Sequence, residues 1–149
     1  MENDLKKQDD LFFTCSLIEY ISRKTKNTKK YVVSYLGKDS INKIYQLASV
    51  YHSENIDKVA DELISKNNIH NGDYDIIKNC KYRVPTYFEI GKVYKRLIVM
   101  ISDSEDSYID NLILVFSSWI IDKIDDYNSS MYYENPNYIY ECYVEGKVL

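Results

Sequence analysis

The chain has 149 residues, which is enough for one domain and too few for two separate hydrophobic cores. Its composition, 45% hydrophobic and 28% charged, is that of a globular protein and excludes a disordered chain. The net charge of −4 disfavours a general nucleic-acid-coating role, which needs clustered Lys and Arg. Because the chain has only 4 Gly and 2 Pro, sharp turns are few, and an all-α fold is favoured over a strand sandwich.

Apolar residues recur at helical spacing along the first half of the chain. They predict helices over residues 11–24 and 28–36, a third that is capped by Asp39 or Ser40 and runs to residue 51, and a fourth that is capped by Ser53 or Asn55 and runs to residue 64. Thr28 is suited to cap the second of these helices, and Gly37 supplies its stop.

Polar residues, an Asn-Gly pair and a Pro mark residues 67–85 as a connector between an N-terminal half, 8–66, and a C-terminal half, 86–149. A short hairpin near residues 74–84 is an alternative to an irregular connector.

The second half of the chain carries clearer helix boundaries. Thr86 and Glu89 form a capping-box pattern, and the stripe over residues 105–126 predicts the longest helix. Asn135 before a proline, and Gly146, bound the last helix. We therefore expect a single helical domain over 1–149, with six or seven helices in one compact bundle-like arrangement.

Several chemistries lack their residues. The four glycines stand apart, so no phosphate-binding fingerprint is present, and two histidines with three scattered cysteines give no metal-ligand spacing. Paired carboxylates, such as Asp125 and Asp126, are explained as solvated or capping groups. These patterns predict a protein that is not an enzyme and has no cofactor or metal site. A charged start and the lack of a long apolar run predict a cytoplasmic protein with no membrane span.

A basic segment without acidic residues covers 23–38. Its bases include Arg23, Lys24, Lys26, Lys29 and Lys30. A solvated basic face explains this segment, and contact with nucleic acid is the alternative.

Charge and aromatic residues are unevenly distributed. Residues 101–149 carry 10 acidic and 2 basic residues, and six tyrosines crowd the last 23 positions. Tyrosine suits both the edge of a core and a wet protein interface. We name Tyr132, Tyr133, Glu134 and Tyr138 as candidate partner-binding residues. His52, which follows Tyr51 at a predicted helix end, is either a helix-end histidine or a further partner contact.

One resemblance adds a direction. Residues 18–36, IEYISRKTKNTKKYVVSYL, followed by LASVYHS at 47–53 and VADELI at 59–64, resemble a family of short uncharacterised bacterial proteins. The match covers about residues 11–66, with Tyr51 and Ser53 replacing the usual Leu and Thr. Genes of that family often neighbour genes for ADP-ribosyltransferase-like toxin candidates, so the resemblance implies an antitoxin or immunity-type partner.

Two functions are thus expected from the sequence. The first is a non-catalytic protein-binding module that neutralises a toxin-like enzyme. The alternative is a small nucleic-acid-binding transcriptional regulator that uses the basic 23–38 segment.

Overall fold

The computed structural model describes residues 2–149, with side chains from residue 4 onward. Every regular element in this part of the chain is helical, which confirms the all-α prediction. The elements are α1 (Glu2–Thr25), α2 (Lys29–Gln46), α3 (Ala48–His52), α4 (Ile56–Lys66), α5 (Tyr87–Ile101), η1 (Glu105–Ser107), α6 (Tyr108–Phe116), α7 (Ile120–Ile124), η2 (Met131–Tyr133) and α8 (Pro136–Glu145), where η marks a 3-10 turn.

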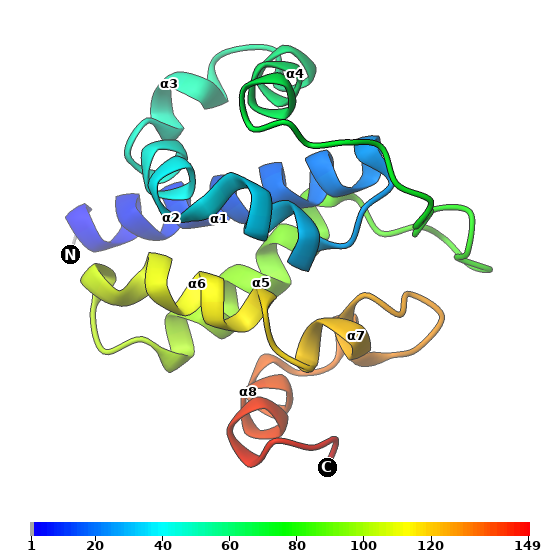
Figure 1. The fold of residues 1–149 in the computed structure, drawn as a ribbon. Helices are drawn as coiled ribbons and strands as arrows, with labels where there is room; N and C mark the ends of the chain where they lie inside the picture. The colour runs from blue at the N-terminus through cyan, green and yellow to red at the C-terminus, as the bar shows by residue number, and fades with distance from the viewer. Residues whose placement is uncertain (1) are drawn as a thin grey trace.

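Helix α1 is the centre of the domain (Figure 1). It packs most extensively against α5, and it also contacts α2, α3 and α4. Helices α3 and α4 lie on one side of α1, and α7 and α8 lie on the other, beyond α5 and α6 (Figure 1). In the C-terminal third, α6 packs against α2 and α5, and α8 packs against α5.

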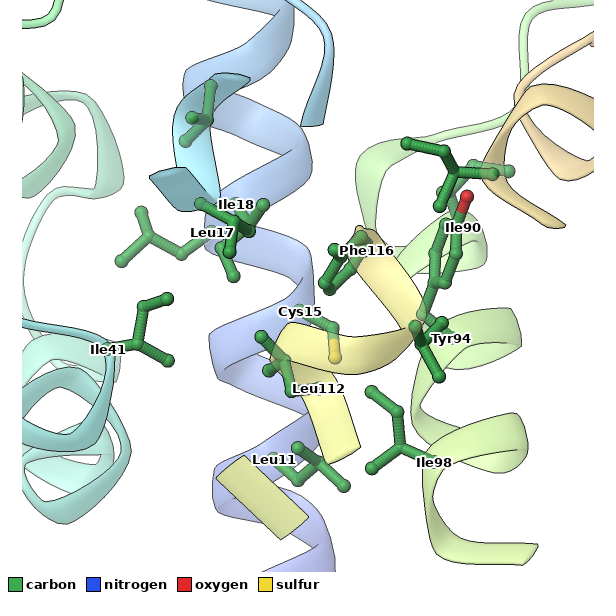
Figure 2. Close-up of a cluster of buried hydrophobic side chains, with 14 of the residues drawn as sticks. Leu11, Cys15, Leu17, Ile18, Ile41, Ile90, Tyr94, Ile98, Leu112 and Phe116 are labelled. Atoms are coloured by element: carbon green, nitrogen blue, oxygen red, sulfur yellow. The ribbon is translucent and has the colours of Figure 1, made fainter. Parts of the chain in front are cut away.

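The core lies between α1, α5 and α6, where Leu11, Cys15, Tyr94 and Phe116 are almost fully buried (Figure 2). The backbones of α1 and α5 approach closely at Gly91. A Cβ atom placed there would lie 2.1 Å from the Ser16 hydroxyl oxygen and 2.9 Å from the Ser16 Cα. Glycine is therefore required at this crossing for steric reasons.

The predicted caps are confirmed. The side-chain oxygen of Thr28 accepts a hydrogen bond from the Tyr31 amide, and that of Thr86 accepts one from the Glu89 amide. The predicted stop at Gly37 is also confirmed. Gly37 adopts a non-helical backbone, with φ 74° and ψ 166°, so α2 consists of two helical segments that meet at a kink there.

The prediction of one long helix over 105–126 is wrong. The longest helix is α1, and the 105–126 segment is divided into η1, α6 and α7. The break falls at Ser117 and Ser118. Ser118 donates its hydroxyl hydrogen to the Val115 carbonyl, a local bond that competes with helix continuation. The apolar pattern continues across the break, because Phe116 and Ile120 are both fully buried in the core. The break divides one predicted helix into two, and the described residues contain eight α-helices rather than six or seven.

The hairpin left open near residues 74–84 does not form; this stretch contains turns and bends. Its backbone groups bond to other segments instead. The Tyr74 amide donates to the Lys26 carbonyl at 2.9 Å, and Asn128 bridges the Lys81 amide and the Asn79 carbonyl. The connector is thus tied to the α1–α2 turn and to the loop after α7.

Candidate partner-binding surface

Four of the predicted partner-binding residues lie together at η2 and the start of α8. Asn135 accepts a hydrogen bond from the Asn137 amide and begins α8 directly after this turn. Tyr133 is 68% exposed, whereas Tyr132 is half-buried and packs its ring edge-on to the buried Tyr127, with centroids 5.6 Å apart. Tyr132 therefore belongs to the edge of the core, and Tyr133 is available to a partner.

Tyr138 on α8 has a partner within the chain. Its hydroxyl donates to the carbonyl of Leu149 at 2.6 Å, which holds the C-terminal residues against this flank of the helix. Glu134, Tyr138 and Val148 line a shallow groove of about 340 Å³. Tyr138 was predicted from the sequence as a partner contact; in the structure it also holds the C-terminal residues against α8.

His52 lies elsewhere. It is exposed at the end of α3, and its ring meets that of Phe13 edge-on at 5.5 Å. It lines a groove of about 470 Å³ together with Asp9, Phe12 and Phe88. Figure 1 places α3 and α8 on opposite sides of the domain. The five predicted residues therefore do not form one continuous surface.

The acidic residues of the C-terminal third are mostly free of ion pairs. Of the ten, Asp110 pairs with Lys38 and Asp125 pairs with Lys29. Among the described residues the other eight have no cation within ion-pair distance: Asp103, Glu105, Asp106, Asp122, Asp126, Glu134, Glu141 and Glu145. Six of these are exposed, so the C-terminal third presents negative charge without ion-pair partners to solvent.

Lys24, Lys26, Lys30 and Lys38 of the basic segment are exposed, as a solvated face requires, and Lys29 is the exception. Lys29 is fully buried, so it is neither part of a solvated face nor able to reach nucleic acid. Arg23 pairs with Glu19, while Lys24 and Lys26 pair with acidic residues of other segments. Among the five bases named from the sequence, only the exposed Lys30 has no ion pair within the described chain.

Lys29 is the centre of a buried charge network that sequence reasoning missed. Its ammonium contacts the carboxylate of Glu19 and, at 2.8 Å, that of Asp125. Tyr94 donates to Asp125 at 2.6 Å, and Tyr127 donates to Glu19 at 2.8 Å. The interpretation of Asp125 as a solvated or capping carboxylate is therefore wrong. No sequence pattern could indicate this pairing, because the partners come from α1, α2, α5 and the end of α7.

Burial and charge have opposite effects within the network. Burial raises the pKa of Asp125 to about 6 because Lys29, shared with Glu19, offsets only part of the desolvation. Burial also opposes ionisation of Glu19, yet Lys29 and Arg23 together hold its pKa below the usual value. The pKa of Lys29 is raised: burial opposes its charge, but the two carboxylates outweigh burial. At neutral pH the network is thus two cations against two carboxylates, each with a partner, which is a structural arrangement rather than a set of free catalytic groups.

A further groove lies at the C-terminal end of the domain. It has a volume of about 440 Å³, and we call it the Trp119 groove. It is lined by Ile101, Ser118, Trp119, Tyr140, Tyr143 and Val144. Sequence reasoning grouped Tyr140 and Tyr143 with the aromatic cluster but did not select them. The available signal was the width of the apolar face on the last helix.

Comparison of the chain with models of known protein families, with curated proteins and with solved structures gave no match. Within residues 2–149, no helix combines the length and apolar character that crossing a bilayer requires. The same residues contain no group of three or more His, Cys, Asp or Glu side chains placed to hold a metal ion.

Proposed function

We propose that the protein is a non-catalytic protein-binding module whose partner presents a basic surface, of the antitoxin or immunity type. The observation that carries this proposal is the uncompensated acidic charge of the C-terminal third, adjacent to the exposed Tyr133. The partner proposed is an ADP-ribosyltransferase-like enzyme, which is what the family resemblance of residues 11–66 implies.

Unpaired carboxylates and an exposed tyrosine favour protein recognition for different reasons. Surface charge of one sign speeds the encounter with an oppositely charged partner and disfavours wrong partners. A tyrosine supplies a large, rigid contact area and a hydroxyl, and tyrosine is enriched among residues that dominate binding energy. Glu134 lies directly after Tyr133, so both contributions occur at one place on the surface.

The nucleic-acid alternative has less support. A phosphate-binding surface needs several free Lys or Arg side chains. Lys29 is buried, and Arg23, Lys24 and Lys26 already face carboxylates. Binding of duplex DNA with a steep salt dependence would favour this alternative over the proposal.

The test is co-expression with the product of the neighbouring gene, followed by size-exclusion chromatography and calorimetry of the complex. The double variant Tyr133→Ala/Glu134→Gln should weaken the complex more than tenfold, since loss of an aromatic anchor at an interface typically costs about 2 kcal/mol or more. The matched control is Tyr82→Ala, in the connector, because Tyr82 is 71% exposed.

Both variants should keep the thermal midpoint of the wild type, because neither removes a buried side chain. Absence of any complex would refute the proposed function. A complex that the double variant forms as tightly as the wild type would move the interface away from Tyr133 and Glu134.

A further inference from the structure

Helix α8 has an apolar face wider than its packing requires. Its buried residues are Ile139 and Cys142, which lie on the side toward α5. Because residues three or four apart share a face of a helix, Tyr143, Tyr140 and Val144 continue this face around the helix. Tyr140 and Tyr143 are only half-buried, and Val144 is 56% exposed. One side of α8 is thus apolar and only partly covered.

The opposite wall of the Trp119 groove comes from a different part of the chain. It is formed by Ile101 at the end of α5 and by Ser118 and Trp119 at the break between α6 and α7. Trp119 is half-buried. Tryptophan and tyrosine partly exposed in one groove are the residues most enriched at the energetic centres of interfaces.

The chain's own C-terminus does not cover this groove. Tyr138 holds the Leu149 carbonyl, and Val148 lies in the separate groove lined by Glu134 and Tyr138. On a helical projection Tyr138 is on the side of α8 opposite to Tyr140. These C-terminal residues therefore leave the Trp119 groove open.

Acidic residues lie close along the chain to residues that line the Trp119 groove. Asp103 follows the end of α5, while Glu141 and Glu145 lie on α8 next to Tyr140 and Val144 in sequence. All three are exposed and have no ion pair within the described residues. An occupant that combines apolar side chains with flanking Lys or Arg would satisfy both the apolar walls and these carboxylates, whereas an acidic segment would be repelled.

We propose that the Trp119 groove binds a segment of a partner protein that places apolar side chains between α8 and Trp119 and basic side chains beside Glu141 and Glu145. This inference rests on the proposed protein-binding function and adds a specific surface and the chemistry of the bound segment. The proposed interface then has Tyr133 and the acidic Glu134 before α8 and the apolar Trp119 groove beside α8.

Trp119 provides the measurement because it is the protein's single tryptophan. The probe is a synthetic 15-residue amphipathic helical peptide with leucines on one face and lysines beside them, without tryptophan or tyrosine. Saturable change in Trp119 fluorescence is expected on titration. A peptide with the same residues in an order that destroys the apolar face should bind at least tenfold more weakly, because its charge is unchanged and its apolar stripe is lost.

Two variants locate the binding. Val144→Asn should weaken the peptide about fivefold or more, since it removes an apolar contact from the groove. Leu114→Asn is the matched control, because Leu114 is 58% exposed on α6 and does not line the groove; it should bind as the wild type does. Glu141→Gln/Glu145→Gln should bind more weakly at low salt and lose most of the salt dependence.

Equal binding of the ordered and disordered peptides, or equal effects of Val144→Asn and Leu114→Asn, would overturn this proposal. Concentration-dependent self-association that Val144→Asn abolishes would also overturn it, by making a second copy the occupant. Peptide binding does not require the neighbouring gene product. If the groove binds the peptide but no complex forms with the neighbouring gene product, only the proposed function is refuted. If that complex forms but the groove does not bind the peptide, only the groove proposal is refuted.

Discussion

Replacing Lys29 by Met removes the cation at the centre of the buried network while keeping most of the side-chain volume. The two carboxylates are affected unequally. Glu19 retains the Arg23 guanidinium at 2.6 Å and the Tyr127 hydroxyl, whereas Asp125 retains only the Tyr94 hydroxyl. Asp125 therefore becomes a buried carboxylate without a cation, and its uncompensated charge destabilises the folded state.

The expected loss is about 3–5 kcal/mol of unfolding free energy, as measured for buried pairs that lose one partner. For a chain of this size about 2–4 °C of thermal midpoint corresponds to each kcal/mol, so the midpoint should fall by roughly 6–20 °C. Urea denaturation followed by far-UV circular dichroism measures the free energy directly. Lys30→Met is the matched control: it changes the same residue type one position along, at an exposed site, and should stay within about 0.5 kcal/mol of wild type.

A second substitution separates charge from packing. In Lys29→Met/Asp125→Asn the uncompensated carboxylate is gone, while the new amide oxygen can still accept the Tyr94 hydroxyl hydrogen. The double variant should therefore lose less unfolding free energy than the two single variants lose together, and the difference should exceed about 1 kcal/mol. A Lys29→Met midpoint within 2 °C of wild type, or strictly additive losses, would refute the assignment of Lys29 as the required counter-charge.

Two other predictions concern the same core. The pKa of Asp125 in the folded protein is raised to about 6, so ionising this carboxyl costs stability, and the cost disappears as pH falls through 6 toward 4. As pH falls from 7 to 5, the wild type should therefore gain stability relative to Asp125→Asn, which urea titrations at each pH measure. An identical pH profile for the two proteins would contradict this prediction. Gly91→Ala should destabilise the protein by about 1–3 kcal/mol in the same assay, since the new methyl group meets Ser16 on α1, and an unchanged midpoint would show that α1 and α5 can separate without cost.

Local chemistry is where the sequence predicted the structure well. Thr28, Thr86 and Asn135 each accept a backbone hydrogen bond at a predicted helix start, and Gly146 ends α8 in the left-handed conformation. These features depend on residues within a few positions of one another, so the sequence contains all the information they need. The all-helical class was also predictable, because the apolar spacing and the scarcity of Gly and Pro act throughout the chain.

The surface of the C-terminal third was predictable in its charge but not in its geometry. The excess of acidic residues over 101–149 is a property of composition. Which tyrosines are buried depends on neighbours far away in sequence: Tyr127 is covered because its hydroxyl reaches Glu19, 108 positions away. The Trp119 groove likewise requires the end of α5, the α6–α7 break and α8 to meet.

Sequence by itself determined the helical class, the caps and the charge of this protein, because each of these follows from local spacing or from composition. The tertiary structure alone decided that Lys29 is a buried counter-charge rather than a surface base, and that the helix is interrupted between Phe116 and Ile120 although its apolar pattern continues. The choice is made by partners that only folding brings together: Glu19 and Asp125 for the lysine, and the shared core for the two helices on either side of the break.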